Sequence, residues 1–335
     1  MALVQADASA GTGIRMFNPF RDLPAVTSLL GRVFSSELKL DSGLGPQTLG
    51  WMKRFPSLAW LWFGLDAWFD SSLTGFVWHE NGRIVGNANI APLSATGRQW
   101  VLSNVAVAPN FRGRGIAGAL VDACIDFAAN HGCERVLLQV WESNVPARHL
   151  YERKGFKTVG KTRRLEFSHG YAPVSQLTSH AVAESWCWRH LRRGDTYTLA
   201  NMAATLSSFE AQAFRSPLVA AFEGTSWNWL GHLGVIFGLG RQHRLVLCEG
   251  DSICGGLAIR TSRKPWSRLT IILAPTVQEK LAGPVAEKAA LLASSQLGRK
   301  VLCDLPDGLA LLGKRLCEEG FREMDSLLQM ALTLS

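Results

Sequence analysis

The chain has 335 residues, of which 47% are hydrophobic and 19% are charged, a balance typical of a globular protein long enough for two domains. Its 35 Lys and Arg residues outnumber its 27 Asp and Glu residues, and the resulting net charge of +8 would suit an anionic ligand or a nucleic acid. The positive residues are scattered in short clusters such as Arg163-Arg164 and Arg192-Arg193, which argues against a nucleic-acid partner.

The sequence also predicts where the protein resides. The most apolar stretch, residues 58–69, is interrupted by Asp66 and falls short of the roughly 20 apolar residues that a membrane-spanning helix needs. The first residues have no basic start and no apolar centre, so we expect a flexible tail over residues 1–13 and no secretory signal. Seven cysteines without a CxxC pair predict free thiols and no metal site in a cytoplasmic protein that has no membrane partner.

The first half of the chain predicts alternating strands and helices. Apolar residues at spacings of three and four between positions 26 and 34 indicate an amphipathic helix, which follows a short strand near Ile14. Asn81-Gly82 lies between two apolar runs and predicts a tight β-hairpin. A strand at residues 101–107, a helix at 116–129, a strand at 135–140 and a helix at 146–154 should follow. This order predicts an α/β fold with a mixed, mostly antiparallel sheet flanked by helices.

The second half of the sequence repeats the first. Residues 76–86 match residues 245–255 without a gap, and residues 136–156 match 301–321, both ending in Gly-Phe. We therefore expect two tandem copies of one fold: a domain at residues 14–167, a linker at 168–185 and a second domain at 186–335. The two copies could pair with each other as a pseudo-dimer.

A glycine-rich turn joins the strand that ends at Val107 to the helix that starts at Ile116. It runs from Arg112 through Gly113 and Arg114 to Gly115. Glycines let the backbone approach a phosphate, the start of a helix presents free N–H groups, and the arginines add positive charge. The turn lacks the Gly-Lys-Ser/Thr of a nucleotide-hydrolysing loop and the spacing of a dinucleotide fingerprint. The alternative is a turn that only caps the helix.

The residues around this turn resemble the signature of the GNAT superfamily of acetyl-CoA-dependent N-acetyltransferases. In that family the turn reads Gln/Arg-x-x-Gly-x-Gly/Ala, which Arg112, Gly115 and Ala117 match. A second family element, Asn-x-x-Ala-x-x-x-Tyr-x-x-x-Gly-Phe, is matched by Asn144, Ala147, Tyr151, Gly155 and Phe156. The resemblance is sharp over residues 104–156 and extends in outline from 14 to 167. It implies acetyl-CoA as cosubstrate, without a metal.

The resemblance implies a role for each matched residue. The backbone of Val105 and Val107 would hold the pantetheine arm, the amides from Arg112 to Ala117 would bind the pyrophosphate, and Asn144 would contact the pantetheine or shape the opening that admits it. Tyr151 would be the catalytic acid that protonates the departing CoA thiolate. In the alternative readings, Tyr151 is a packed core aromatic and Asn144 only caps a helix. The implied cofactor-binding set is Val105, Ala106, Val107, Arg112, Gly113, Arg114, Gly115, Ile116, Ala117, Asn144, Ala147 and Tyr151.

The base and the acceptor are less well indicated. A base or a water chain must remove a proton from the attacking amine, and Glu142 is the nearest carboxylate in the sequence, although a solvated loop glutamate is the favoured interpretation. His79 and Glu80 are weaker candidates, so the base stays unassigned. Aromatic residues at 51–52, 60–62 and 68–69 could bind an amine by cation–π contact, but a core or interdomain face is the commoner use.

The second copy departs from the family pattern where the chemistry would occur. Gln278 stands at the Arg112 position and Leu281 at the Gly115 position, and Leu309 and Leu316 replace the matched Asn and Tyr. A β-carbon would crowd the phosphate site and leucine cannot form hydrogen bonds, so we expect a degenerate copy. The predicted function is acetyl transfer from acetyl-CoA to a primary amine of a small molecule or peptide. A CoA-binding sensor and a two-domain scaffold are the alternatives, and the retained Tyr in the first copy favours the enzyme.

Overall fold

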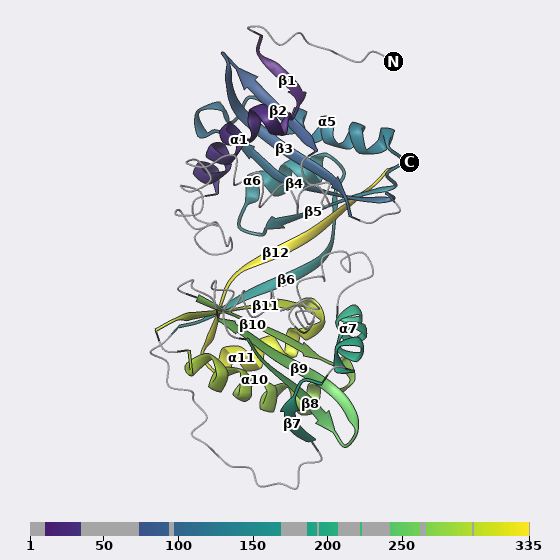
Figure 1. Ribbon diagram of the computed structural model, residues 1–335, viewed down its shortest axis with the longest axis vertical. Coiled ribbons are helices and arrows are strands. Elements are labelled where there is room, and N and C mark those ends of the chain that lie inside the picture. Colours follow the sequence, from purple (N-terminus) through teal and green to yellow (C-terminus); the bar gives the residue numbers. More distant parts are fainter. Residues whose placement is uncertain are drawn as a thin grey trace. The chain divides into compact units, whose positions relative to one another are not determined.

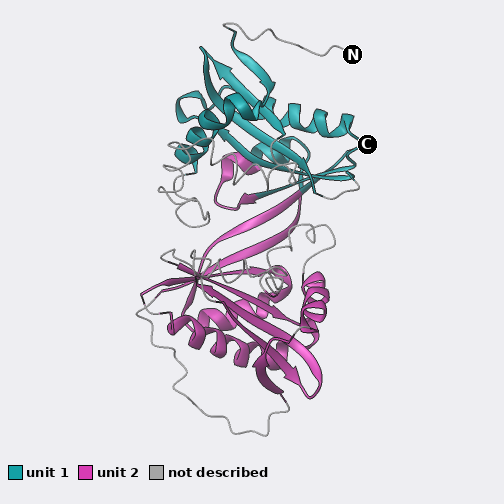
Figure 2. Cartoon of the chain, in the orientation of Figure 1, with its two compact units in different colours: residues 1–139, 149–157, 331–335 teal, residues 140–148, 158–330 magenta. Residues whose placement is uncertain are grey.

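The computed structural model describes residues 11–34, 74–93, 97–168, 186–192, 194–206, 222, 242–261, 266–296 and 298–334. The aromatic segment at 51–69 and the predicted linker beyond residue 168 lie outside the described residues. The chain divides into two compact units (Figure 2). Unit 1 comprises Met1–Gln139, His149–Lys157 and Ala331–Ser335, and unit 2 comprises Val140–Arg148 and Thr158–Met330.

The elements of the first half follow the predicted order (Figure 1). They are β1 (Gly13–Met16), α1 (Pro19–Val33), β2 (Gly75–Glu80), β3 (Arg83–Pro92), β4 (Gln99–Val107), the 3₁₀ turn η1 (Pro109–Phe111), α5 (Ile116–Asn130), β5 (Arg135–Trp141) and α6 (Val145–Arg153). Asn81 and Gly82 have φ angles of 51° and 73°, the positive values that a two-residue hairpin turn requires. Asn18 caps α1 by accepting a hydrogen bond from the Phe20 N–H.

The second half repeats this order. The first copy ends with β6 (Lys157–Phe167), and the elements of the second are β7 (Trp186–His190), α7 (Asp195–Thr205), β8 (Gln242–Glu249), β9 (Ser252–Thr261), β10 (Trp266–Leu273), η3 (Pro275–Val277), α10 (Gln278–Ser294), β11 (Lys300–Pro306), η4 (Asp307–Leu309), α11 (Ala310–Glu318) and β12 (Phe321–Thr333). The strands are hydrogen-bonded in the order β1-β2-β3-β4-β5-β12-β6-β11-β10-β9-β8-β7. Where the register is described, β4–β5 and β10–β11 are parallel and the other pairs are antiparallel. The mixed, mostly antiparallel sheet with flanking helices is confirmed.

Neither unit is one continuous stretch of the sequence. In unit 1, the Leu334 N–H from the end of the chain donates to the Glu134 carbonyl at 2.8 Å. In unit 2, the Glu142 N–H, which follows β5, donates to the Ser326 carbonyl of β12 at 2.7 Å. Each unit therefore contains a segment from the other half of the chain.

The internal repeat is visible in matching irregularities of the strands. The β2–β3 register shifts between Trp78 and His79, and the β8–β9 register shifts between Leu247 and Cys248, which are the positions that the sequence repeat aligns. A 3₁₀ turn follows both β4 and β10. Because bulges are specific local features rather than general properties of strands, their match supports two copies of one fold.

Helices α1 and α5 cover opposite faces of the sheet of unit 1. Val77 of β2 packs against Val26 of α1. A β-carbon on Gly86 of β3 would instead meet Leu120 and Ile116 of α5 within 3.0 Å. Helix α6 is on the α5 side, where Lys154 at its end donates to Asp122 of α5.

All seven cysteines are unpaired. Among the described residues, no group of three His, Cys, Asp or Glu side chains could hold a metal ion. None of the described helices is both long enough and apolar enough to cross a bilayer.

An Arg–Asp pair joins the first strand to the first helix in each copy, a feature that the sequence repeat did not reveal. Arg15 donates from both terminal nitrogens to the carboxylate of Asp22, at 2.5 and 2.7 Å. Arg189 donates in the same way to Asp195, at 2.6 and 2.9 Å. Both carboxylates are buried, and each also accepts from a backbone N–H. The pair therefore fixes the strand to the start of the helix in both units.

We expect Asp22→Asn to lower the free energy of unfolding by about 3 kcal/mol, because it leaves the Arg15 guanidinium without its buried partner. Burial alone would raise the pKa of Asp22, but hydrogen bonds from Arg15 and the Asn18 N–H outweigh it and hold the pKa below its ordinary value. The pair's contribution is therefore complete above about pH 4 and is lost as the pH falls through the folded-state pKa. Urea titrations between pH 3 and 7 measure it.

The control is Asp126→Asn, which removes an exposed carboxylate from α5 in the same unit. This variant should lose less than about 0.5 kcal/mol at every pH. Equal losses in the two variants would contradict the role given to the Arg15–Asp22 pair.

Candidate functional site

Strands β4 and β5 are paired along only part of their length. Their parallel register covers three pairs, from Gln99 with Arg135 to Val101 with Leu137. Strand β4 continues to Val107, so its last six residues have no described pairing with β5. Backbone N–H and C=O groups on such an edge need other partners, and an extended ligand can supply them. Val105, Ala106 and Val107 of the predicted cofactor set lie on this segment.

A β-bulge interrupts β4 just before these residues. Asn104 has a φ of 53°, and β4 carries one more residue than β3 between the Asn87–Ala106 and Asn89–Ser103 pairs. The buried amide of Asn87 donates to the Asn104 carbonyl at 3.0 Å and to the Asn89 side chain at 2.8 Å. Asn87 Oδ1 has no hydrogen-bond partner in the described part of the chain. This network was not predicted, although two Asn residues in an apolar strand could have signalled it.

The glycine-rich turn has the backbone geometry that the sequence predicts. Gly113 and Gly115 have φ angles of 77° and 78°, and helix α5 begins directly afterwards at Ile116. No side chain caps this helix start in the described residues. A β-carbon added at either glycine would meet no atom within 4 Å. The first N–H groups of α5 are thus left beside open space, an arrangement that suits a phosphate.

The two arginines of the turn are engaged with the protein itself. Arg112 donates through Nε to the Val107 carbonyl at 3.2 Å. Arg114 donates to Glu80 at 3.0 Å and lies over the Phe111 ring. Each guanidinium group thus has a protein partner, whereas the backbone amides at the start of α5 have no side-chain cap among the described residues. Glu80, considered as a base, is the salt-bridge partner of Arg114.

Tyr151 lies on α6 in the same unit and is 7% exposed. Its ring packs edge-on against Phe156, with ring centroids 5.9 Å apart. Burial, with a smaller effect of nearby Cys124, raises the pKa of Tyr151 to about 12. Tyr151 is thus both a packed aromatic and a neutral hydroxyl that can donate a proton at pH 7.

The site candidates Glu142, Asn144 and Ala147, which follow β5, belong to unit 2. Asn144 Oδ1 accepts from the Ala147 N–H at 3.3 Å and so caps the start of α6, the structural alternative for this residue. The carboxylate of Glu142 accepts from Lys161 at 2.7 Å, and this hydrogen bond holds the pKa of Glu142 below its ordinary value. A paired carboxylate of low pKa is a poor proton acceptor, so the structure weakens the case for Glu142 as the base.

The second copy has no glycine turn. Helix α10 begins at Gln278, the residue aligned with Arg112, so the segment that forms the turn in the first copy is helical in the second. Leu281, aligned with Gly115, is completely buried. Gln278 donates to the Gly308 carbonyl at 2.6 Å, and the Gly308 N–H donates to the Leu206 carbonyl at 3.2 Å. Both backbone groups of Gly308, just beyond the end of β11, are therefore bonded within the protein.

A comparison of the sequence with known families identifies the fold family. Residues 45–156 match the model of the acetyltransferase (GNAT) family, a segment that includes the bulge, the glycine turn and Tyr151. Over this segment the chain is similar to the GNAT acetyltransferases. Its GNAT signature lies in the first copy, where the unpaired segment of β4 and the open turn are found.

Curated relatives match only part of the chain. Mycothiol acetyltransferase of Beutenbergia cavernae is 39% identical over 97 residues, which are 28% of this chain and 31% of that protein. Glucosamine 6-phosphate N-acetyltransferase of Trypanosoma brucei brucei is 33% identical over 95 residues, 27% of this chain and 63% of that protein. The matches thus span less than two thirds of either relative.

Solved structures are similar over nearly the whole chain. A tandem GNAT protein from the clavulanic acid biosynthesis pathway superposes with a TM-score of 0.60 at 14% identity, covering 96% of this chain and 98% of that one. Similarity at this level concerns the fold. It supports the arrangement of two tandem GNAT copies.

We expect Gly115→Ala to weaken acetyl-CoA binding at least about tenfold, or about 1.4 kcal/mol. The added methyl group would enter the open space beside the helix start, where the phosphate would lie. Isothermal titration calorimetry with acetyl-CoA measures the effect.

Gly132→Ala is a matched control at the other end of α5. Gly132 has a φ of 77° and equally open surroundings, so both variants carry a similar backbone strain of about 1 kcal/mol. Only Gly115→Ala should change the affinity. Equal affinities in both variants would exclude the turn as the phosphate site.

Proposed function

We propose that the chain is an acetyl-CoA-dependent N-acetyltransferase that acetylates a primary amine of a small molecule or peptide. Residues 14–167 would be the catalytic domain and 186–335 a degenerate copy. The main support is the sequence of features along β4: an edge without a partner, then two glycines with positive φ, then the uncapped start of α5. The open space at both glycines fits a pyrophosphate, and the strand edge fits an extended pantetheine arm.

When bound, acetyl-CoA supplies a thioester whose carbonyl carbon bonds to the amine nitrogen as the C–S bond breaks. Tyr151 is suited to donate its O–H to the departing sulfur because its pKa of about 12 keeps it protonated at pH 7. A thiol has an ordinary pKa near 8.5, so a donated hydrogen bond stabilises the thiolate even before a proton is transferred. The proton released by the amine would leave through water, since Glu142 is paired with Lys161.

The relatives differ in the acceptors that their names state. One is named for mycothiol and another for glucosamine 6-phosphate. An amine acceptor is consistent with the glucosamine phosphate relative, and the choice of amine would depend on residues that differ between the relatives.

We expect Tyr151→Phe to lower kcat about 100-fold while the affinity for acetyl-CoA changes little, because only the hydroxyl is removed. The loss should be similar from pH 7 to 10, since the hydroxyl stays protonated throughout that range. Release of free CoA thiol measures kcat, and calorimetry measures binding.

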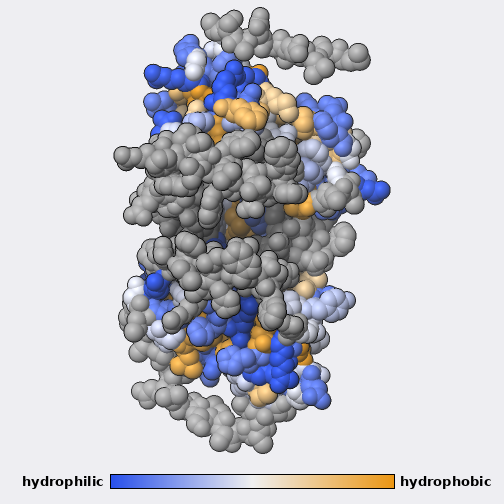
Figure 3. Space-filling view, viewed as in Figure 1, coloured by the Kyte–Doolittle hydropathy of each residue, from blue (hydrophilic) through white to orange (hydrophobic). Residues whose placement is uncertain are grey.

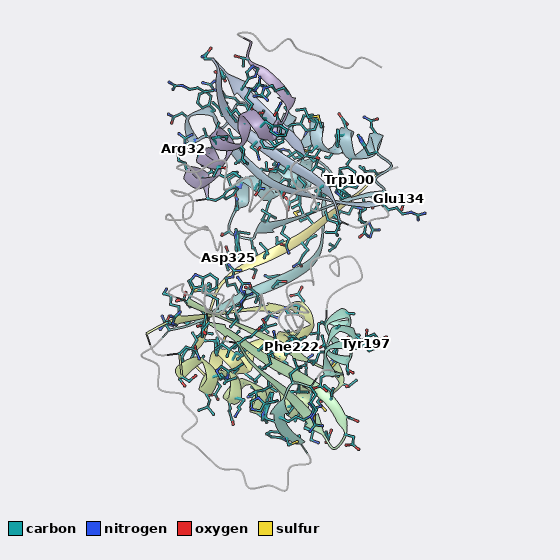
Figure 4. The ribbon with its side chains drawn as sticks, viewed as in Figure 1. Arg32, Trp100, Glu134, Tyr197, Phe222 and Asp325 are labelled. Carbon is teal, nitrogen blue, oxygen red and sulfur yellow. The ribbon has the colours of Figure 1, made fainter. Side chains whose placement is uncertain are left out.

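Tyr197→Phe is the control for this substitution. Tyr197 is 76% exposed on α7 of unit 2 (Figure 4), and its variant should retain full activity. If Tyr151→Phe also kept full activity, Tyr151 would have no part in the reaction. Binding of acetyl-CoA without thiol release for any amine would favour a CoA-binding sensor instead.

We further expect one acetyl-CoA per chain in calorimetry, because Gln278 and Leu206 already bond the Gly308 backbone in the second copy. Gly115→Ala should weaken that single binding event. A second site that persists with unchanged affinity in Gly115→Ala would show that the degenerate copy also binds the cofactor.

A further inference from the structure

A cavity of about 880 Å³ lies in unit 1, and the Arg15–Asp22 pair forms part of its lining. Helix α1 forms one wall, the turn between β2 and β3 forms another, and residues 108–111 form a third. This last wall begins one residue beyond Val107, the end of the β4 segment proposed to hold the cofactor. The cavity therefore lies next to the proposed site along the chain.

The cavity is strongly basic. Its charged side chains are those of Arg15, Arg21, Arg32, Arg83 and Asp22. Four guanidinium groups and one carboxylate give a net charge of +3. In Figure 3, hydrophilic side chains gather over the end of unit 1 that carries β1 and the β2–β3 turn. A cavity of one charge sign concentrates ligands of the opposite sign.

Within the part of the chain that the structure describes, two of the arginines have no carboxylate partner. Asp22 is bonded on both oxygens by Arg15 and is also within 3.3 Å of Arg21. Arg83 has no ion-pair partner among the described residues, and Arg32 donates only to the Ser28 carbonyl, at 3.4 Å. Since Asp22 is already satisfied, it does not compete for Arg32 and Arg83, whose charges are left for a ligand.

The cavity is on the face of the sheet from which an acceptor would approach. The proposed cofactor site begins at the start of α5, and α5 and α6 share one face of the sheet. Helix α1 covers the opposite face. A cofactor that binds from the α5 side would fill that side of the gap between β4 and β5. The amine would then reach the thioester from the α1 side.

From these observations we infer that the acceptor is a small amine that also carries a phosphate or carboxylate group, and that Arg32 and Arg83 bind that acidic group. The inference rests on the proposed function, which it makes more specific. A simple amine is a cation near pH 7 and would be repelled by a cavity of charge +3. An acidic group on the same molecule reverses that preference, and guanidinium groups bind phosphate and carboxylate through paired hydrogen bonds.

The test compares amines in matched pairs. Ethanolamine is paired with O-phosphoethanolamine, glucosamine with glucosamine 6-phosphate, and β-alaninamide with β-alanine, so that the phosphate and carboxylate sources are separated. Thiol release at saturating acetyl-CoA should give a kcat/KM at least tenfold higher for the acidic member of at least one pair. Arg83→Gln and Arg32→Gln should each reduce that preference at least fivefold, mainly through KM, and leave the KM for acetyl-CoA unchanged.

Arg98→Gln is the control for the loss of one positive charge in the same unit. Arg98 is 70% exposed and pairs loosely with Glu134, which lies on the opposite side of unit 1 from Arg32 (Figure 4). This variant should keep the full preference for the acidic amine. An equal loss in Arg98→Gln would mean that net charge alone, rather than the cavity, causes the effect.

The outcomes separate this inference from the proposed function. Transfer to the amines without an acidic group, at the same kcat/KM as to their phosphate or carboxylate analogues, would overturn the inference and leave the proposed function intact. Absence of thiol release with every amine would count against the proposed function. In that case calorimetry measures the binding of O-phosphoethanolamine in the presence of CoA. Binding that weakens at least fivefold in Arg83→Gln supports the inference that the cavity binds an acidic amine, and absence of binding overturns it.

Discussion

The early end of pairing between β4 and β5 is the constraint on which the site of unit 1 depends. After three residue pairs the two strands separate, although β4 continues for six more residues. An unpaired edge within a sheet is costly unless water or a ligand satisfies it. The bulge at Asn104 and the glycine turn both lie on β4 or directly after it, beyond the last pair. Strand β4 and the turn that follows it thus contain the unpaired edge, the bulge and the proposed anion site.

The second copy shows that the arrangement of strands can be kept while the glycine turn is lost. Strands β10 and β11 also pair over a short parallel register, and the Arg–Asp pair and the β8–β9 bulge are retained. The backbone beyond β11 is nevertheless satisfied internally, through the contacts of Gly308 with Gln278 and Leu206. Without positive-φ glycines, the aligned segment becomes the first turn of α10. The fold therefore tolerates loss of the turn, because the buried pair and the core stabilise it independently.

Local patterns predicted the elements of the first copy well, because hairpin turns, helix starts and positive-φ glycines depend on adjacent residues. Asn81-Gly82 and the Gly113–Gly115 turn are examples that the structure confirms. The place of β12 between β5 and β6 was not predicted, since strand order depends on pairing between segments far apart in the sequence. The Asn87 network and the Arg15–Asp22 pair were missed for a different reason, since side-chain bonds such as these depend on how the strands and helices pack. The assignment of Tyr151 as the acid came from family resemblance, and its pKa required knowledge of burial.

The two anion sites inferred for unit 1 differ in the groups that form them. In the turn, Arg112 and Arg114 each bond the protein through one nitrogen, and the backbone N–H groups at the start of α5 are the proposed principal donors. Their positions are set by the φ angles of two glycines and do not depend on any side chain. In the cavity beside α1, the available charges belong to Arg32 and Arg83, which a single substitution can remove. A cosubstrate common to a family is best bound by backbone, and an acceptor that differs between relatives by side chains, so acceptor preference can change at these arginines without loss of acetyl-CoA binding.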